Sequence, residues 1–431
     1  MTQPPRGRLG PDDLSAVDAI VAPADAATAR DYPGERAGRA PVHTVYVPAD
    51  RVRAGLAASW GAQAREALDR FAPDAESLAL ATGLDEDQVR GCWDVLLAKL
   101  SIEPVEDLRI DLEDGYGRRP DEREDEDVVR AVRAVAQDAA QGLAPPWWGI
   151  RFASFEPATR HRGVRTLDLA IGAALEVGPL PDGFVVTLPK VSSVEQVRAM
   201  VELCRRLEHA YALPDAGLRF EVQVETPQAV LAADGSATVA KVVHEGGRRL
   251  LGLHFGTYDY SAALGVPSSF QSLEHPAADH AKAVMQLAAA GTGVRVADGS
   301  TNVLPVGDGD QVRAAWRLHT RLVRRSLRRG LYQGWDLHPA QLVTRHLAVC
   351  TFFREGLPEA GSRLRAYTAR QGGGVLDEPA TAQALAGFLL RAMDCGAVTP
   401  TEARSASGLQ REALDRLVRR ALPAQTSDAE P

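Results

Sequence analysis

The chain has 431 residues, of which 45% are hydrophobic and 25% are charged, and its formal net charge is −8. This length is too great for one small core and predicts either a large α/β domain with an appendage or two domains. The acidic balance argues against a nucleic-acid binder. No apolar run approaches the roughly 18 residues that a membrane span needs, so we expect no membrane association.

The cysteines predict a reducing compartment. There are four of them, they are widely scattered, and they form no CxxC pair; they are Cys92, Cys204, Cys350 and Cys395. Such a pattern is typical of reduced thiols in a cytoplasmic protein and not of a zinc site or a disulfide framework. Residues 1–10 have no apolar core, so we expect no secretory signal.

Short apolar runs alternate with helical stretches along most of the chain. Residues 1–40, rich in Pro, Gly, Asp and Ala, predict a poorly packed lead-in with one short helix around 12–21. Eight strands are predicted at 43–47, 108–112, 147–152, 184–190, 219–225, 250–255, 293–297 and 334–339. Helices are predicted at 51–70, 74–82, 85–99, 125–141, 164–176, 193–212, 228–246, 276–291 and 309–329.

Eight strands that are each followed by helix predict an α/β fold of the (β/α)₈ TIM-barrel type. We expect the barrel over 41–340, with a helical insert at about 71–106. Residues 341–431 predict an α-helical C-terminal lid or appendage, with breaks at 356–358, 372–374 and 395–400. An open doubly wound sheet is the competing fold, but it needs a glycine turn after the first strand, and Val47-Pro48-Ala49-Asp50 is not one.

Two of the predicted strands end in carboxylates. Glu225 closes the run 219–225 before Pro227, and Asp259 follows the run 250–255 and a Gly256 turn. Adjacent parallel strands would bring both side chains to one edge, where they repel unless a cation or a proton lies between them. A hard divalent ion such as Mg²⁺ suits one or two carboxylates plus water. The alternative is that each residue caps the helix that follows it.

Ionisable residues end other predicted strands as well. They are Glu113, Asp114, Arg151, Lys190 and His338. In a barrel the strand ends face one rim, so acids and bases would alternate around the place where catalysis occurs. All but Lys190 have a structural alternative. These are a salt bridge to Asp111 or Glu113 for Arg151, a helix N-cap for Glu113 and Asp114, and a core position beside Pro339 for His338.

Seven motifs in register resemble one family. In chain order they are Tyr46-Val47-Pro48-Ala49, Asp111-Leu112-Glu113-Asp114-Gly115, Gly149-Ile150-Arg151, Leu188-Pro189-Lys190, Val224-Glu225-Thr226-Pro227, Gly256-Thr257-Tyr258-Asp259 with Leu264-Gly265, and Leu337-His338-Pro339-Ala340-Gln341. Their order resembles that of the citrate lyase β-subunit and malyl-CoA lyase-like aldolases, the HpcH/HpaI group. The resemblance runs from about 43 to about 395, and Gly373–Pro379 is similar to the family's lid segment.

The resemblance implies a TIM barrel that binds Mg²⁺, with Mn²⁺ as the alternative, through Glu225 and Asp259. It implies a carbon–carbon lyase or aldolase that acts on a small 2-oxo or hydroxy acid or its CoA thioester. Cleavage leaves an enolate, whose charge a metal and the guanidinium of Arg151 can stabilise. Asp377 resembles a lid aspartate that acts as acid/base from a neighbouring subunit, which implies a homo-oligomer.

The resemblance also assigns substrate binding. Arg151, Lys190, Glu113 and Asp114 are its candidates, the acids holding metal-bound waters and Lys190 balancing their charge. A Schiff-base lysine is disfavoured because the metal already accepts the electrons. The chain departs from the family in three ways. It has an insert at 71–106, a longer separation of 34 positions from Glu225 to Asp259, and no Asn after Arg151. The rival hypotheses are a free-acid pyruvate-type aldolase and a non-catalytic ligand-binding or regulatory protein on a retained barrel.

Overall fold

The computed structural model describes residues 7–369 and 378–419. Eight parallel strands lie side by side in the order β7-β6-β5-β4-β3-β2-β1-β8. The strands are β1 His43–Pro48, β2 Asp107–Asp111, β3 Trp147–Arg151, β4 Val185–Leu188, β5 Arg219–Val224, β6 Leu250–Phe255, β7 Arg295–Ala297 and β8 Gly334–Asp336. A parallel bridge between Ala297 and Gln333 joins the two ends of the sheet. The predicted TIM-barrel fold is therefore confirmed.

Helices follow the strands as the alternating pattern predicted. They are α2 Leu56–Phe71, α3 Ala75–Thr82, α4 Glu86–Ile102, α5 Asp121–Ala140, α6 Arg160–Leu175, α7 Val194–Ala210, α8 Pro227–Val230, α9 Thr238–Gly246, α10 Thr257–Ala263, α11 Pro276–Ala289 and α12 Gly309–Arg328. The segment predicted as one helix over 228–246 is wrong in one respect, because a loop over 231–237 separates α8 from α9. This loop contains Asp234 and a left-handed Gly235, which favour a turn.

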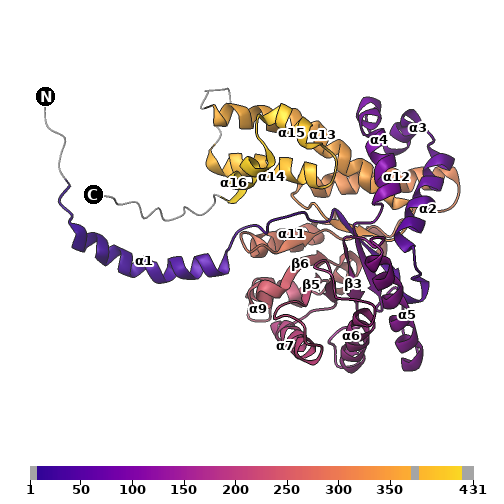
Figure 1. Cartoon of the computed structure of the whole chain (residues 1–431), viewed down its shortest axis with the longest axis horizontal. Coiled ribbons are helices and arrows are strands. Elements are labelled where there is room, and N and C mark those ends of the chain that lie inside the picture. The colour runs from indigo at the N-terminus through magenta and orange to yellow at the C-terminus, as the bar shows by residue number, and fades with distance from the viewer. Residues whose placement is uncertain (1–6, 370–377, 420–431) are drawn as a thin grey trace.

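The N-terminal helix α1 (Pro11–Asp31) is longer than the short helix predicted, and none of its residues is buried. Figure 1 shows it extending away from the barrel. The chain after it is anchored: the Gly34 amide donates to the Gly291 carbonyl at 2.7 Å, and Arg36 donates to the carbonyls of Gly293 and Leu250. These contacts lie just before and at the starts of β7 and β6, so the lead-in crosses the end of the barrel opposite the strand carboxyl ends.

Four helices form the described part of the C-terminal extension: α13 Gln341–Thr368, α14 Pro379–Asp394, α15 Pro400–Ser407 and α16 Arg411–Arg419. The break predicted at 356–358 is wrong, because α13 continues through Pro358. A Cβ on Gly356 would lie 2.5 Å from the Phe388 ring, so the glycine permits close packing of α14 and does not end the helix. The break predicted near 395–400 is present.

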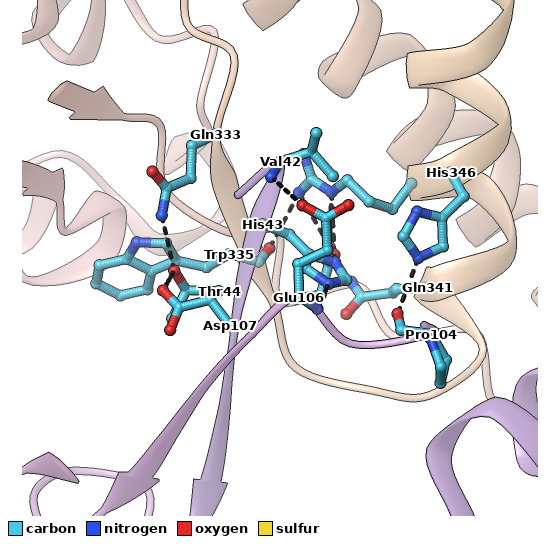
Figure 2. Close-up of polar contacts among 12 residues, drawn as sticks. Val42, His43, Thr44, Pro104, Glu106, Asp107, Gln333, Trp335, Gln341 and His346 are labelled. Carbon is cyan, nitrogen blue, oxygen red and sulfur yellow. Dashed lines mark hydrogen bonds and ion pairs between the residues drawn. The ribbon is translucent and has the colours of Figure 1, made fainter. Parts of the chain in front are cut away.

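A polar cluster attaches α13 and the segment that follows α4 to the barrel (Figure 2). The Glu106 amide donates to His43 Nε2, so the proton on that imidazole lies on Nδ1 and points to Asp336 at 2.8 Å. His346 of α13 donates to the Pro104 carbonyl at 2.8 Å, and the Glu106 carboxylate accepts from the Val42 amide. Each partner is buried or nearly so, and the contacts fix the extension to the outer face of β1 and β8.

The barrel interior carries charged side chains. Inward positions alternate along a strand, and Arg109 of β2 reaches across to Glu221 of β5 through two hydrogen bonds of 3.0 Å. Arg109 also donates to Asp107, and Glu221 lies 3.0 Å from His254 Nε2. All four residues are at most 3% exposed. The interior therefore holds a buried ion-pair network beneath the carboxyl ends of the strands.

None of the described helices combines the length and the hydropathy that crossing a membrane requires.

The interior network gives a prediction about stability. Arg109→Met leaves Asp107 and Glu221 buried without their shared cation, so we expect a loss of about 3–5 kcal/mol in the free energy of unfolding. Arg133→Met is the matched control, because Arg133 and Glu176 form a pair whose side chains are 48% and 60% exposed, and it should cost less than about 1 kcal/mol. Urea unfolding measures both, and equal losses would contradict a structural role for the network.

Candidate active site

Six predicted site residues converge where β2 to β6 end. Glu113 and Asp114 lie in the turn after β2, and Arg151 is the last residue of β3. The other three follow their strands: Lys190 comes two residues after β4, Glu225 directly after β5, and Asp259 in the first turn of α10 after β6. The structure thus brings these residues together, as strand ends of a parallel barrel require.

Lys190 lies at the centre of the acidic cluster. Its ammonium donates to Asp114 at 2.8 Å and to Asp259 at 3.3 Å, and it lies 3.3 Å from Glu113. The residue has a φ of 50°, a left-handed conformation that costs about 1–3 kcal/mol in a residue other than glycine and that is typical of functional sites. The surrounding carboxylates raise the pKa of Lys190 against the opposing effect of burial, so the side chain stays a cation.

Glu225 is held in place from both sides. Its side chain accepts a 2.7 Å hydrogen bond from the Lys190 amide, and the residue is 2% exposed. On its other side, a Cβ on Gly256 would lie 2.3 Å from Glu225 Cβ, so only glycine fits there. Thr226, and not Glu225, caps α8 by accepting from the Ala229 amide. Burial, with a smaller contribution from Asp259, raises the pKa of Glu225 to about 7.

Asp259 is half exposed, and its described contact is with Lys190. The N-cap of α10 is Gly256, so Asp259 lies inside the first turn. Neither Glu225 nor Asp259 is therefore a helix cap, which was the alternative for both residues. Both carboxylates contact Lys190. Glu225 accepts from its main-chain amide, and Asp259 accepts from its ammonium.

Arg151 pairs with Asp111, which was the plainer alternative for this residue. The guanidinium donates through Nε and Nη2 to the two Asp111 oxygens, both at 2.7 Å, and its Nη1 lies 3.4 Å from Glu113. The Tyr46 ring stacks 4.8 Å from the guanidinium carbon. Such a bidentate pair fixes the orientation of the guanidinium, so its remaining edge is presented at the rim in a defined direction.

Asp111 also shapes the turn that carries the acid pair. It accepts from the amides of Glu113 and Gly115 at 3.0 Å each, and a Cβ on Gly115 would lie 2.4 Å from its carboxylate. Glu113 and Asp114 are in this turn and do not cap a helix, since α5 begins at Asp121 after Pro120. Burial raises the pKa of Glu113, whereas the ammonium of Lys190 overcomes burial and lowers the pKa of Asp114.

The side chains present fit a hard divalent cation. Five carboxyl groups face two basic groups, so the cluster has an excess of acid; the acids are Asp111, Glu113, Asp114, Glu225 and Asp259. Mg²⁺ prefers such oxygen ligands and takes one or two carboxylates together with water. Within residues 7–369 and 378–419, no group of three or more His, Cys, Asp or Glu is arranged to hold a metal ion. A carboxylate pair completed by other oxygens is the arrangement that fits.

The remaining candidates lie elsewhere. His338 is half-buried, its Nδ1 accepts from the Ala340 amide, and burial lowers its pKa; it belongs to the turn after β8. Asp377 lies outside the described residues. Sequence analysis gave Asp111 only as one of two alternative salt-bridge partners of Arg151, and it missed Tyr46 beneath the guanidinium. The alternation of Asp107, Arg109 and Asp111 at every second position was the available signal, because it places all three on one face of β2.

Comparison with known proteins adds the following. The family model described as "Domain of unknown function (DUF6986)" matches residues 21–422, and no curated protein sequence matches. The chain is similar in structure to Haloferax volcanii malate synthase in a magnesium/glyoxylate complex, with 17% identity over 90% of this chain and 100% of that chain and a TM-score of 0.48. CitE from Mycobacterium tuberculosis, in complex with magnesium, acetoacetate and coenzyme A, has 19% identity over 83% and 99% of the two chains and a TM-score of 0.48. The HpcH/HpaI aldolase from Desulfitobacterium hafniense has 15% identity over 66% and 90%, with a TM-score of 0.34. These similarities do not by themselves assign a reaction to the chain.

The raised pKa of Glu225 gives a prediction about stability and pH. The pKa rises from 4.5 to about 7 on folding, so within this window the folded chain holds a proton that the unfolded chain has released. Raising the pH through the window should therefore destabilise the metal-free protein, by up to about 3 kcal/mol from this group. Glu225→Gln should lack this loss. Urea unfolding in EDTA between about pH 5 and about pH 8 measures both proteins, and parallel curves would be inconsistent with the buried carboxyl.

Proposed function

The chain belongs to the DUF6986 family, and we propose that it is a divalent-metal-dependent carbon–carbon lyase or aldolase that acts on a small 2-oxo or hydroxy acid or its CoA thioester. The observation that carries the proposal is the approach of Glu225 and Asp259, from β5 and β6, to the same residue, Lys190. The motifs at these positions are those that resemble the citrate lyase β-subunit-like aldolases.

Glu225 and Asp259 are the proposed ligands of Mg²⁺ or Mn²⁺. When bound there, the metal supplies a Lewis acid that stabilises negative charge developing on a carbonyl oxygen. The buried Glu225 must lose its proton to act as a ligand, and Lys190 and Arg151 favour that loss because both lower its pKa. The half-exposed Asp259 completes the pair at the solvent side.

Arg151 is the proposed catalytic and substrate-binding cation. Its guanidinium is charged at all relevant pH values and can hold a carboxylate or a developing oxyanion through two N–H groups. Asp111 and Tyr46 fix its plane, so the guanidinium needs no reorganisation when charge develops, which is the main source of electrostatic catalysis.

Lys190, Glu113 and Asp114 are the proposed substrate-binding group. Lys190 is held as a cation by three carboxylates, so it serves as a donor of hydrogen bonds and not as an amine nucleophile. Glu113, whose pKa burial raises, can hold a proton or a water next to the guanidinium. The acid pair thus orders the polar end of the substrate and the water around the cation.

Asp377 is the proposed acid/base, supplied by a neighbouring subunit of a homo-oligomer. In this arrangement the extension over 341–431 acts as a lid or appendage on the barrel over 41–340, with the insert at about 71–106 packed beside it. The support for this assignment is the motif at 373–379, where Glu378 and Pro379 begin α14.

A metal-dependent screen tests the reaction. Purified protein with Mg²⁺ is incubated with 2-oxo acids, hydroxy acids, aldehydes and acyl-CoAs, and the products are identified by mass. We expect carbon–carbon cleavage or formation that EDTA abolishes, and a loss of at least about 10³-fold in Glu225→Gln. Glu202→Gln, on the exposed face of α7, is the matched control and should retain the wild-type rate. Turnover that persists in EDTA or in Glu225→Gln would refute the metal assignment, and tight binding without turnover would favour a binding protein.

Subunit complementation tests Asp377. We expect Asp377→Asn and Glu225→Gln homo-oligomers to be inactive, and co-expressed mixtures to regain up to about a quarter of the activity because some sites then receive both intact residues. Mass photometry of the mixture confirms the subunit number. An active monomer, or mixtures that stay inactive although subunits exchange, would contradict a contribution in trans.

A further inference from the structure

Gln223 is a buried carboxamide without partners. It belongs to β5 and is 0% exposed, yet neither its Nε2 nor its Oε1 has a hydrogen-bond partner among the described residues. Leaving a buried donor or acceptor unsatisfied costs about 1–3 kcal/mol per group. A buried amide with both groups unsatisfied therefore calls for a partner outside the chain, which can be a ligand or an ordered water.

The position of Gln223 places its side chain inside the barrel. Side chains alternate along a strand, and Gln223 lies between Glu221, which reaches Arg109 across the interior, and Glu225 at the rim. Its side chain thus occupies the layer between the ion-pair network and the proposed metal ligands. The carboxamide thus lies beneath the rim where Glu225 and Asp259 approach Lys190.

The neighbours of Gln223 are already engaged. His254 is its register partner on β6, and that imidazole accepts from the Trp335 indole at Nδ1 and contacts Glu221 at Nε2. Glu221 in turn accepts from Arg109 and Thr187. His254 and Glu221 therefore have partners other than the two amide groups of Gln223.

A second unpaired polar atom lies under the guanidinium. The Tyr46 hydroxyl is buried and has no hydrogen-bond partner within the described residues. The Tyr46 ring contacts Arg151 above and Trp335 beside it, with centroid distances of 4.8 Å to each. Trp335 also donates to His254, the register partner of Gln223, so a chain of contacts links Tyr46 to the strand beside Gln223.

We propose that Gln223 and Tyr46 form a hydrogen-bonding floor that holds a hydroxyl group of the ligand at the deep end of the site. A carboxamide presents one donor group and one acceptor, and a phenol does the same. A ligand hydroxyl, which donates one hydrogen bond and accepts others, complements that set, whereas a carboxylate offers acceptors only. The ligand class is therefore a hydroxy acid, with its carboxylate toward Arg151.

This inference deepens the proposed function and rests on the same site. A site built to hydrogen-bond a hydroxyl discriminates strongly against an analogue that lacks it, because its own polar groups are then left unpaired. Lactate and propionate differ by one hydroxyl, so the ratio of their dissociation constants measures the floor directly. The measurement is binding at equilibrium and requires no turnover.

Calorimetric titration of the Mg²⁺-loaded full chain with each acid is the test. We expect wild type to bind lactate at least about tenfold more tightly than propionate. Gln223→Met, which keeps the volume and removes both polar groups, should lower this ratio to about two or less, and Tyr46→Phe should lower it as well. Thr320→Val is the matched control, because the Thr320 hydroxyl is likewise buried without a partner but lies in α12, outside the barrel interior. It should keep the wild-type ratio.

The outcomes separate this inference from the reaction. If folded Gln223→Met and Tyr46→Phe keep the wild-type ratio, the two residues do not bind the ligand hydroxyl and hold a trapped water only. A wild type that binds neither acid would also overturn the proposal. If the ratio depends on Gln223 but no metal-dependent turnover exists, the proposed reaction fails and the hydroxy-acid site stands. If turnover is present and the ratio does not depend on Gln223, the reverse holds.

Discussion

The convergence of parallel strands at one rim concentrates acid, and the rest of the site depends on how that charge is balanced. Glu113, Asp114 and Asp259 share the ammonium of Lys190, and Glu225 accepts from the Lys190 main-chain amide, so four carboxylates from three strand ends gather around one residue. Like charges this close cannot all ionise without cations between them. The proposed divalent ion would neutralise the excess of carboxylates over basic groups. Burial, with a smaller contribution from Asp259, raises the pKa of Glu225.

The interior of the barrel supports this rim through buried charged residues that are paired with one another. The ion pair of Arg109 and Glu221 is satisfied on every side by Asp107, Thr187 and His254, so the layer can be dry and rigid without unpaired charge. Above it, Asp111 orients Arg151 through two hydrogen bonds. Rigid support beneath the rim is what allows charged groups to act on a ligand without first reorganising.

The alternation of short apolar runs with helical stretches predicted the barrel, since a strand that is buried on both faces of a parallel sheet has a short apolar run as its sequence. The strand ends then placed Glu225 and Asp259 correctly at one rim. The sequence did not decide the pairing across strands: it left Asp111 and Glu113 as alternative partners of Arg151, and it did not show that Arg109 faces inward to Glu221. The helix break predicted at 356–358 was wrong, because packing of Phe388 on Gly356 outweighs the local tendency of Pro358 to end α13.

The account stands on a cation shared by Glu225 and Asp259. Anomalous diffraction from crystals grown with Mn²⁺ measures this directly, since manganese scatters anomalously and its ligands lie at distances characteristic of hard cations. The account predicts one strong anomalous peak within coordination distance of a carboxylate oxygen of each residue, with the ammonium of Lys190 displaced from Asp259. A peak elsewhere in the molecule, or none at saturating Mn²⁺, would contradict it.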